Sequence, residues 1–283
     1  MNKTTGGVMA YAFPGAGALD YFPCQYGTSR VLFRGPRCDT TAAYLAMLGG
    51  SETYGRYVAD PFATLVGCHI GVPVANLGCV NAGPDVFLNE PAVLEVAAGA
   101  TVTVVQVLGA QNLSNRFYTV HPRRNDRFLG ATPQLRAIFR DVDFTEFHFT
   151  RHLLKGLQAT SIDRFEVVAE ELKAAWVARM KLLLSRVSGR SVLVWISDAP
   201  PPGPSRRADL SLGPILIDAE MISAIRPLAS DYVQVVLSPS ARARGTEGMV
   251  CGPMEVTAAA GLPGPWAHQE IAAALLPAIR ALI

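Results

Sequence analysis

The chain has few charged residues and almost no net charge. Charged side chains make up 17% of the 283 residues, whereas about 25% is usual in soluble proteins. The 25 basic residues nearly balance the 23 acidic ones, which leaves a net charge of +2. A charge this small supplies no overall field that would attract nucleic acid or a membrane surface, so we expect neither as a partner. The low charged fraction is compatible with a buried contact between copies of the chain, and a homo-oligomer is therefore a further prediction.

The sequence also lacks paired cysteines and long apolar runs. Its cysteine count is odd, and no Cys-x-x-Cys spacing occurs among Cys24, Cys38, Cys68, Cys79 and Cys251. Scattered cysteines are typical of a reduced, intracellular protein and not of a disulfide framework. No segment approaches the roughly 18 uninterrupted apolar residues of a membrane span, and the polar first seven residues do not resemble a signal peptide. We expect a cytoplasmic protein without a membrane span.

Motifs for cofactors and metals are missing as well. The sequence has neither an internal repeat nor a glycine-rich phosphate loop, so nucleotide binding has no support and we expect no cofactor. His148 and His152 stand four residues apart on a predicted helix, but the glutamate of a His-Glu-x-x-His motif and a third ligand are absent. We therefore assign no metal site and expect the two histidines to pack beside Phe147 and Phe149.

An apolar run at residues 44–48 ends at two glycines and is followed by Ser51. The run is typical of a buried strand in a parallel sheet, and Gly49 and Gly50 can accept the tight turn after it. Ser51 is thus predicted at the carboxyl edge of the sheet, where open α/β folds bind ligands. The alternative is a serine that only caps the turn.

Strand and helix patterns alternate along the rest of the chain. Apolar, β-branched segments predict further strands at residues 72–77, 101–108, 192–196 and 232–237. Periodic or proline-initiated segments predict helices at residues 61–68, 84–96, 144–157, 162–187 and 268–283. This order predicts a three-layer α/β/α domain with a doubly wound, mostly parallel five-stranded sheet. We place the domain at residues 41–283, with a helical insertion at about 113–160, and expect the aromatic-rich residues 1–40 to form an arm packed on the domain or on a subunit partner.

Four sequence features occur in an order that resembles the SGNH/GDSL hydrolase superfamily. The first three blocks of that family are similar to Gly50-Ser-Glu-Thr-Tyr-Gly55, Asn76-Leu-Gly-Cys-Val-Asn-Ala-Gly83 and Thr101-Val-Thr-Val-Val-Gln-Val-Leu-Gly-Ala-Gln-Asn112. His268 stands where the fifth block has its histidine. The resemblance covers most of residues 44–283 and implies an SGNH-like fold. The chain also resembles uncharacterised bacterial proteins that share the stretches at residues 49–55 and 112–118, which indicates no function.

The resemblance implies roles for five residues in acyl transfer. Ser51 would attack the substrate, and His268 would take its proton. The main-chain amides of Ser51 and Gly78, with the side chain of Asn112 or Gln111, would hold the oxyanion. Gln111 occupies the position at which the family has asparagine, and Asn112 follows one place later. A histidine that only caps the final helix is the alternative for His268.

The orienting acid of the family is absent from its usual place. Pro265 stands three residues before His268, where the family has aspartate. A backbone carbonyl, Glu255 or Asp198 could orient the imidazole instead. Replacing the orienting aspartate in serine proteases costs about 10⁴ in turnover, so this departure predicts a slow or differently oriented pair.

A basic segment follows the third block directly. Guanidinium groups bind planar anions in a bidentate way, and we predict a substrate clamp formed by Arg116, Arg123, Arg124 and Arg127. An exposed loop held by salt bridges is the alternative. The leading hypothesis is a serine-dependent ester hydrolase or O-acyltransferase that acts on a polar saccharide or lipid precursor, anionic if the arginines bind it. The alternative is a non-catalytic ligand-binding or assembly protein that keeps the same fold.

Overall fold

The computed structural model describes residues 19–187, 189–203 and 207–283. Residues 1–18 of the predicted arm, including Tyr11 and Phe13, lie outside the described residues. In the described part of the arm, Tyr26 and Phe33 are buried in the same apolar core as the helix at Pro91–Gly99. Their packing is supported by a backbone bridge between Cys24 and Phe33.

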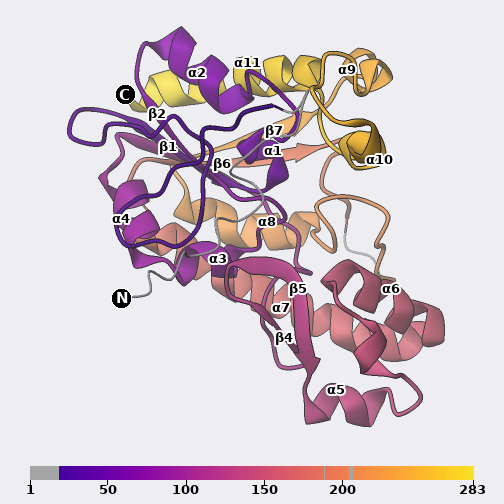
Figure 1. Cartoon of the computed structure of the whole chain (residues 1–283). Helices are drawn as coiled ribbons and strands as arrows, with labels where there is room; N and C mark the ends of the chain where they lie inside the picture. Colours follow the sequence, from indigo (N-terminus) through magenta and orange to yellow (C-terminus); the bar gives the residue numbers. More distant parts are fainter. Residues whose placement is uncertain (1–18, 188, 204–206) are drawn as a thin grey trace, which may run out of the picture.

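A five-stranded sheet lies at the centre of the structure, with helices around it (Figure 1). Its order is β2-β1-β3-β6-β7, and all neighbouring strands are parallel. The strands are β1 (Leu45–Gly49), β2 (Val74–Gly78), β3 (Val102–Gln106), β6 (Ser191–Ser197) and β7 (Asp231–Val236). The chain passes from β1 to β2 on one side and returns to β3 on the other, so the carboxyl ends of β1 and β3 flank the switch point of the sheet.

Alternate side chains of each strand enter two separate cores. Along β1, Ala46 and Leu48 belong to one core, and Leu45 and Met47 belong to the other, as the period of two in a strand requires. The first core is covered by α3 (Pro84–Leu88), α4 (Pro91–Gly99), α7 (Ile162–Arg186) and α8 (Ala219–Ile225). The second is covered by α2 (Phe62–Ile70), α9 (Pro239–Arg244) and α11 (Pro265–Leu282). The predicted three-layer α/β/α fold with a doubly wound parallel sheet is confirmed.

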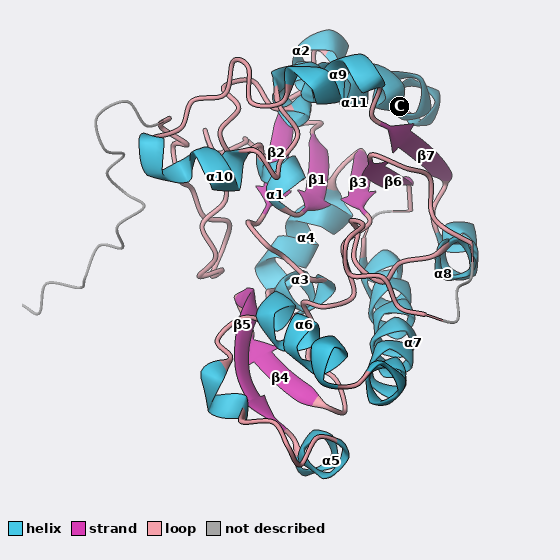
Figure 2. Ribbon diagram, turned by 90° about the vertical axis from the view of Figure 1, so that its right-hand side faces the viewer, coloured by secondary structure: helices cyan, strands magenta, loops and turns pink. Residues whose placement is uncertain are grey.

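Residues 113–160 form a hairpin and short helices where the sequence predicted a basic loop followed by a helix. The elements are β4 (Tyr118–His121), β5 (Arg124–Ala131), α5 (Pro133–Ile138), a short 3-10 helix (Phe144–Glu146) and α6 (Thr150–Thr160). The two strands pair antiparallel. Figure 2 shows the hairpin, α5 and α6 grouped beyond the arrowheads of β1 and β3. The insertion therefore lies at the carboxyl edge of the central sheet.

Two predicted helices have different boundaries in the structure. The helix predicted at residues 84–96 is divided into α3 and α4, because Pro91 begins a new helix after Glu90. The last helix begins at Pro265, three residues earlier than predicted, with Gly264 as its N-cap. His268 thus lies within the first turns of α11 and not at its start. Among the described residues, no helix is both long enough and apolar enough to cross a membrane.

Candidate functional site

The turn that carries Ser51 is fixed by the side chain of Gln106, at the end of the neighbouring strand β3. Gln106 Oε1 accepts hydrogen bonds from the backbone nitrogen of Gly50 (2.9 Å) and from Thr53 Oγ1 (2.6 Å). Its Nε2 donates to Glu52 Oε2 at 2.8 Å. Ser51 begins the short helix α1 (Ser51–Tyr54). One buried amide therefore holds the serine turn against the adjacent strand.

Ser51 faces a residue from the loop after β2. Ser51 is 7% exposed, and its Oγ accepts a hydrogen bond from the backbone nitrogen of Asn81 at 3.1 Å and donates to Asn81 Oδ1 at 3.5 Å. Asn81 has a φ of 55°, in the left-handed region that asparagine tolerates better than most residues. Its Nδ2 donates to Asp126 Oδ2 at 3.1 Å. Asn81 thus joins the serine turn to the insertion hairpin.

Asn112 and Thr150 complete this hydrogen-bond chain. Asn112 Nδ2 donates to the carbonyl oxygen of Asn81 at 2.9 Å, and Thr150 Oγ1 donates to Asn112 Oδ1 at 2.6 Å. Gln111 is not part of the chain, and its buried Oε1 has no hydrogen-bond partner within the described residues. Of the two residues that the sequence left open, Asn112 is the one hydrogen-bonded to Asn81, the partner of Ser51.

Three members of this chain are absent from the sequence-based site. Asn81 lies inside the second block. An asparagine shortly after a strand indicates a residue with a left-handed backbone conformation, which Asn81 has. Asp126 and Thr150 belong to the insertion, where periodicity gives no information about which side chains reach the sheet. Strand β5 of the hairpin brings Asp126 to Asn81, and the start of α6 brings Thr150 to Asn112.

The prediction for Gly78 is corrected by the structure. Its N–H donates to Asn76 Oδ1 at 2.9 Å, so it is already used inside strand β2. A Cβ at Gly78 would lie 2.2 Å from the backbone nitrogen of Tyr54. The close packing of α1 on β2 therefore requires glycine at position 78. The main-chain amide that faces Ser51 is that of Asn81 instead.

The structure also contradicts the predicted role of His268. The ring is 1% exposed and stacks on Phe62, with the ring centroids 5.7 Å apart. Its Nδ1 accepts a hydrogen bond from the backbone nitrogen of Phe62 at 3.0 Å. Burial, assisted by the charge of Arg34, lowers the pKa of His268 from 6.5 to about 3. A neutral imidazole with an accepting Nδ1 carries its proton on Nε2.

This tautomer is the wrong one for a base. A serine proton must be accepted by a nitrogen without a proton, and the only such nitrogen of His268 is occupied by Phe62. Within the described part of the chain, no hydrogen bond joins His268 to Ser51. His268 acts as a cap for the first turn of α2, and the predicted Ser–His pair is not formed.

The two alternative orienting acids lie elsewhere. Glu255 Oε1 accepts hydrogen bonds from Arg56 Nη2 (3.3 Å) and from the hydroxyl of Tyr57 (3.2 Å). Asp198 is exposed after the end of β6. Neither carboxylate hydrogen-bonds to the imidazole of His268 in the described chain.

The predicted arginine clamp is not assembled either. Arg116 pairs with Glu171 at 2.7 Å, and Arg123 pairs with Glu90 at 3.0 Å. The guanidinium of Arg127 lies over the ring of Phe149, 4.9 Å from its centroid. Arg124 is exposed at the start of β5. Three of the four arginines are thus engaged by different elements, in accord with the salt-bridged alternative.

The side chains that contact Ser51 and its partners are amides and carboxylates, whereas Arg34 hydrogen-bonds the carbonyls of Tyr54 and Gly55 at the other end of α1. Asp126 hydrogen-bonds to Asn81, and Glu52 follows Ser51 directly. Cys79 lies close to Asp126 and Arg124, and burial, reinforced by Asp126, raises the pKa of its thiol to about 12. The thiol is therefore protonated and a poor nucleophile.

The histidine pair of the sequence lies in the insertion, away from Ser51. His152 packs edge-on against Phe147, with ring centroids 4.9 Å apart, which agrees with the packing account of that histidine. No cluster of three or more potential metal-ligating side chains occurs among residues 19–187, 189–203 and 207–283.

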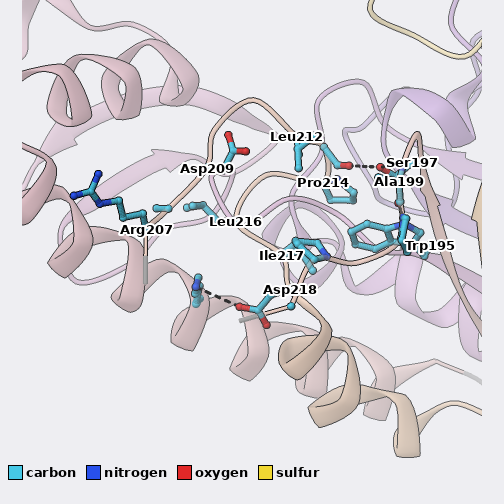
Figure 3. Close-up of a pocket in the computed structure, with 16 residues that line it drawn as sticks. Trp195, Ser197, Ala199, Arg207, Asp209, Leu212, Pro214, Leu216, Ile217 and Asp218 are labelled. Atoms are coloured by element: carbon cyan, nitrogen blue, oxygen red, sulfur yellow. Dashed lines mark hydrogen bonds and ion pairs between the residues drawn. The ribbon is translucent and has the colours of Figure 1, made fainter. Parts of the chain in front are cut away.

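A pocket of about 180 Å³ lies at the end of β6, within the loop that follows Ser197 (Figure 3).

The fold and this site define a doubly wound α/β domain with a hydrogen-bonded serine at the switch point of its sheet. The chain belongs to the family described as a domain of unknown function (DUF6473), whose model matches residues 9–283. A search of curated proteins found no match.

Two solved structures are similar to this chain, an extracellular lipase from Streptomyces rimosus and phospholipase A1 from Streptomyces albidoflavus NA297. Each has 10% sequence identity and a TM-score of 0.38, and each match covers 86% of this chain and 100% of the other.

Proposed function

We propose that the serine turn binds a small hydroxyl-bearing ligand, such as a saccharide, and does not use a Ser–His pair for hydrolysis. The observation that carries this proposal is the hydrogen bond from the backbone nitrogen of Phe62 to Nδ1 of His268. It leaves the imidazole without a nitrogen that can accept a proton from Ser51. The protein then corresponds to the non-catalytic alternative that the missing aspartate already suggested.

The choice of ligand follows from the groups at the turn. Amides both donate and accept, and carboxylates accept, so pairs of them match neighbouring hydroxyl groups. Asn81 is exposed, and Glu52 and Asp126 are half-buried, so these side chains border solvent near Ser51. Two carboxylates beside the serine disfavour an anion, and three of the four arginines expected to attract one are already engaged.

Ester hydrolysis or O-acyl transfer is a second candidate, favoured by one distance. The backbone nitrogen of Asn81 lies 3.1 Å from Ser51 Oγ, and an amide at this place could stabilise an oxyanion formed on an attacked ester. In this candidate Ser51 would attack a polar ester, and a group other than His268 would take its proton.

Labelling with a fluorophosphonate probe separates the two candidates. We expect no more labelling of the wild type than of Ser51→Ala, and no hydrolysis of p-nitrophenyl esters above that variant. Specific labelling of Ser51 that persists in His268→Asn would support the second candidate. Labelling that is lost in His268→Asn would restore the Ser–His pair.

Sugar binding provides the positive test. We expect free neutral monosaccharides, observed by saturation-transfer NMR, to bind in preference to uronic acids. Asn81→Gly keeps the left-handed backbone and removes only the side chain, and it should weaken binding about tenfold. Arg116→Ala is the matched control, because that arginine is paired with Glu171, and it should bind like the wild type. Equal binding by wild type and Asn81→Gly, or no binding of any sugar, would overturn the proposal.

A further inference from the structure

The pocket at the end of β6 has charged groups of both signs at its base. Lys173 Nζ, from α7, lies 3.3 Å from Asp218 Oδ2, and the side chains are only 18% and 11% exposed. Asp218 Oδ1 accepts a hydrogen bond from the backbone nitrogen of Met221 at 3.0 Å, which fixes the carboxylate at the start of α8. Lys173 also lies 3.6 Å from Glu170, whose side chain is 70% exposed. An ammonium and a carboxylate are thus held side by side at the pocket.

The walls of the same pocket are largely apolar. Trp195 is 1% exposed, and its Nε1 donates to the carbonyl oxygen of Ala199 at 2.8 Å, so the polar group of the indole is already satisfied. Pro214, Leu216 and Ile217 also line the pocket. The hydroxyl of Ser197 donates to the carbonyl oxygen of Gly213 (Figure 3). Contacts with these walls are therefore mainly apolar.

A second pair of opposite charges lies farther out. Arg207 and Asp209 line the pocket and are drawn on the side away from Trp195 in Figure 3. Hydrogen bonding from the side chain of Ser211, and from its backbone nitrogen at 2.7 Å, lowers the pKa of the Asp209 carboxyl. The lining therefore has two cations and two anions and no excess of either sign.

This arrangement selects among ligand classes. Lys173 and Asp218 are paired with each other, so a ligand with a single charge would bring a charge without a partner to them, which is costly. A simple anion at the base would meet Asp218 together with Lys173, and a simple cation would meet Lys173 together with Asp218. A molecule with both an ammonium and a carboxylate can satisfy both side chains, while an apolar substituent packs on Trp195 and Leu216.

We propose that this pocket binds a small zwitterion with an apolar side group, of the size and chemistry of a free amino acid such as leucine or phenylalanine. The volume of about 180 Å³ is suited to a molecule of this size. This site is separate from the proposal for Ser51, which does not line the pocket, and either proposal can fail without the other.

Calorimetry with leucine and its blocked derivatives tests the ligand class. Leucine should bind about tenfold or more tightly than N-acetyl-leucine, which lacks the ammonium, and than leucine methyl ester, which lacks the carboxylate. The same order is expected for phenylalanine. Binding of the blocked compounds as tightly as the amino acid, or no binding of either amino acid, would overturn the proposal.

Variants at the base locate the site. Asp218→Asn keeps an acceptor for the helix cap and should weaken leucine binding about tenfold. Glu170→Gln is the matched control, because Glu170 contacts Lys173 but does not line the pocket, and it should leave binding unchanged. Tryptophan fluorescence should change on binding in the wild type and in Trp266→Phe, but not in Trp195→Phe. Equal affinity of Asp218→Asn and wild type would contradict the assignment of the ammonium to Asp218.

Discussion

The serine turn and the start of α11 hold the two residues that a Ser–His hydrolase must bring together, and they have opposite surroundings. Ser51 lies in a polar chain of Asn81, Asn112 and Asp126 at the carboxyl edge. His268 lies in the apolar layer between α2 and α11, where it caps Phe62. Residues at motif-like positions in the sequence therefore need not share a proton in the structure. The surroundings of His268 follow from its place in the first turns of α11, where the ring faces Phe62.

The largest effect is expected where α1 packs on β2. Gly78→Ala places a Cβ 2.2 Å from the backbone nitrogen of Tyr54, and because backbone cannot move aside easily we expect a loss of about 3 kcal/mol in the free energy of unfolding. Gly130→Ala is the control, since no atom lies within 4 Å of its added Cβ, and it should change stability by less than about 0.5 kcal/mol. Equal denaturation midpoints for the two variants would show that the serine turn is not packed as described.

The pH dependence of the free energy of unfolding tests the apolar surroundings of His268. The pKa of His268 is about 3 in the folded protein, below its ordinary value of 6.5, so between these values the unfolded chain binds a proton that the folded one excludes. Stability therefore falls as the pH drops through this window, by roughly 2 to 3 kcal/mol from pH 6 to pH 4.

The variant His268→Asn isolates this effect, because Oδ1 can replace Nδ1 as the acceptor but does not titrate. Denaturant unfolding at both pH values should show the additional loss in the wild type only. The same loss in both proteins would mean that His268 is not held neutral.

Removal of Asn112 tests the polar side of the comparison. Asn112→Ala leaves the carbonyl of Asn81 and the hydroxyl of Thr150 without their partner, and we expect a loss of about 2 kcal/mol. Gln111→Ala should cost less than about 1 kcal/mol, since its Oε1 makes no hydrogen bond with the described residues. Thermal unfolding of both variants provides the ranking, and the reverse order would move the supporting role to Gln111.

The smallest effects are expected in the insertion. Arg123→Ala removes an ion pair with Glu90 and should cost about 1 kcal/mol at most. Arg124→Ala removes an exposed side chain and should have almost no effect on the free energy of unfolding. A larger loss for Arg124→Ala would indicate that this arginine has a structural partner that the described contacts do not include.

Periodicity and turn residues predicted the sheet because burial on both faces of a parallel strand requires continuous apolar runs. The same reasoning placed Ser51 correctly at the end of β1. It failed for His268, because Pro265 begins the last helix three residues earlier and turns the imidazole toward Phe62. It missed Asp126, since the hydrogen bond between Asp126 and Asn81 joins residues 45 positions apart, and no short motif encodes such a contact. Elements were predictable from local sequence, and side-chain partners across elements were not.

The protonation of His268 is the most direct test of this account. Two-dimensional ¹⁵N–¹H NMR of the imidazole, recorded from pH 8 to pH 4.5 on wild type and Ser51→Ala, reports which nitrogen carries the proton. We predict a neutral ring with the proton on Nε2, an unprotonated Nδ1, no titration in this range and identical spectra for the two proteins. A proton on Nδ1, a pKa between 6 and 7, or a shift of the ring signals in Ser51→Ala would contradict the account and return His268 to the serine as its base.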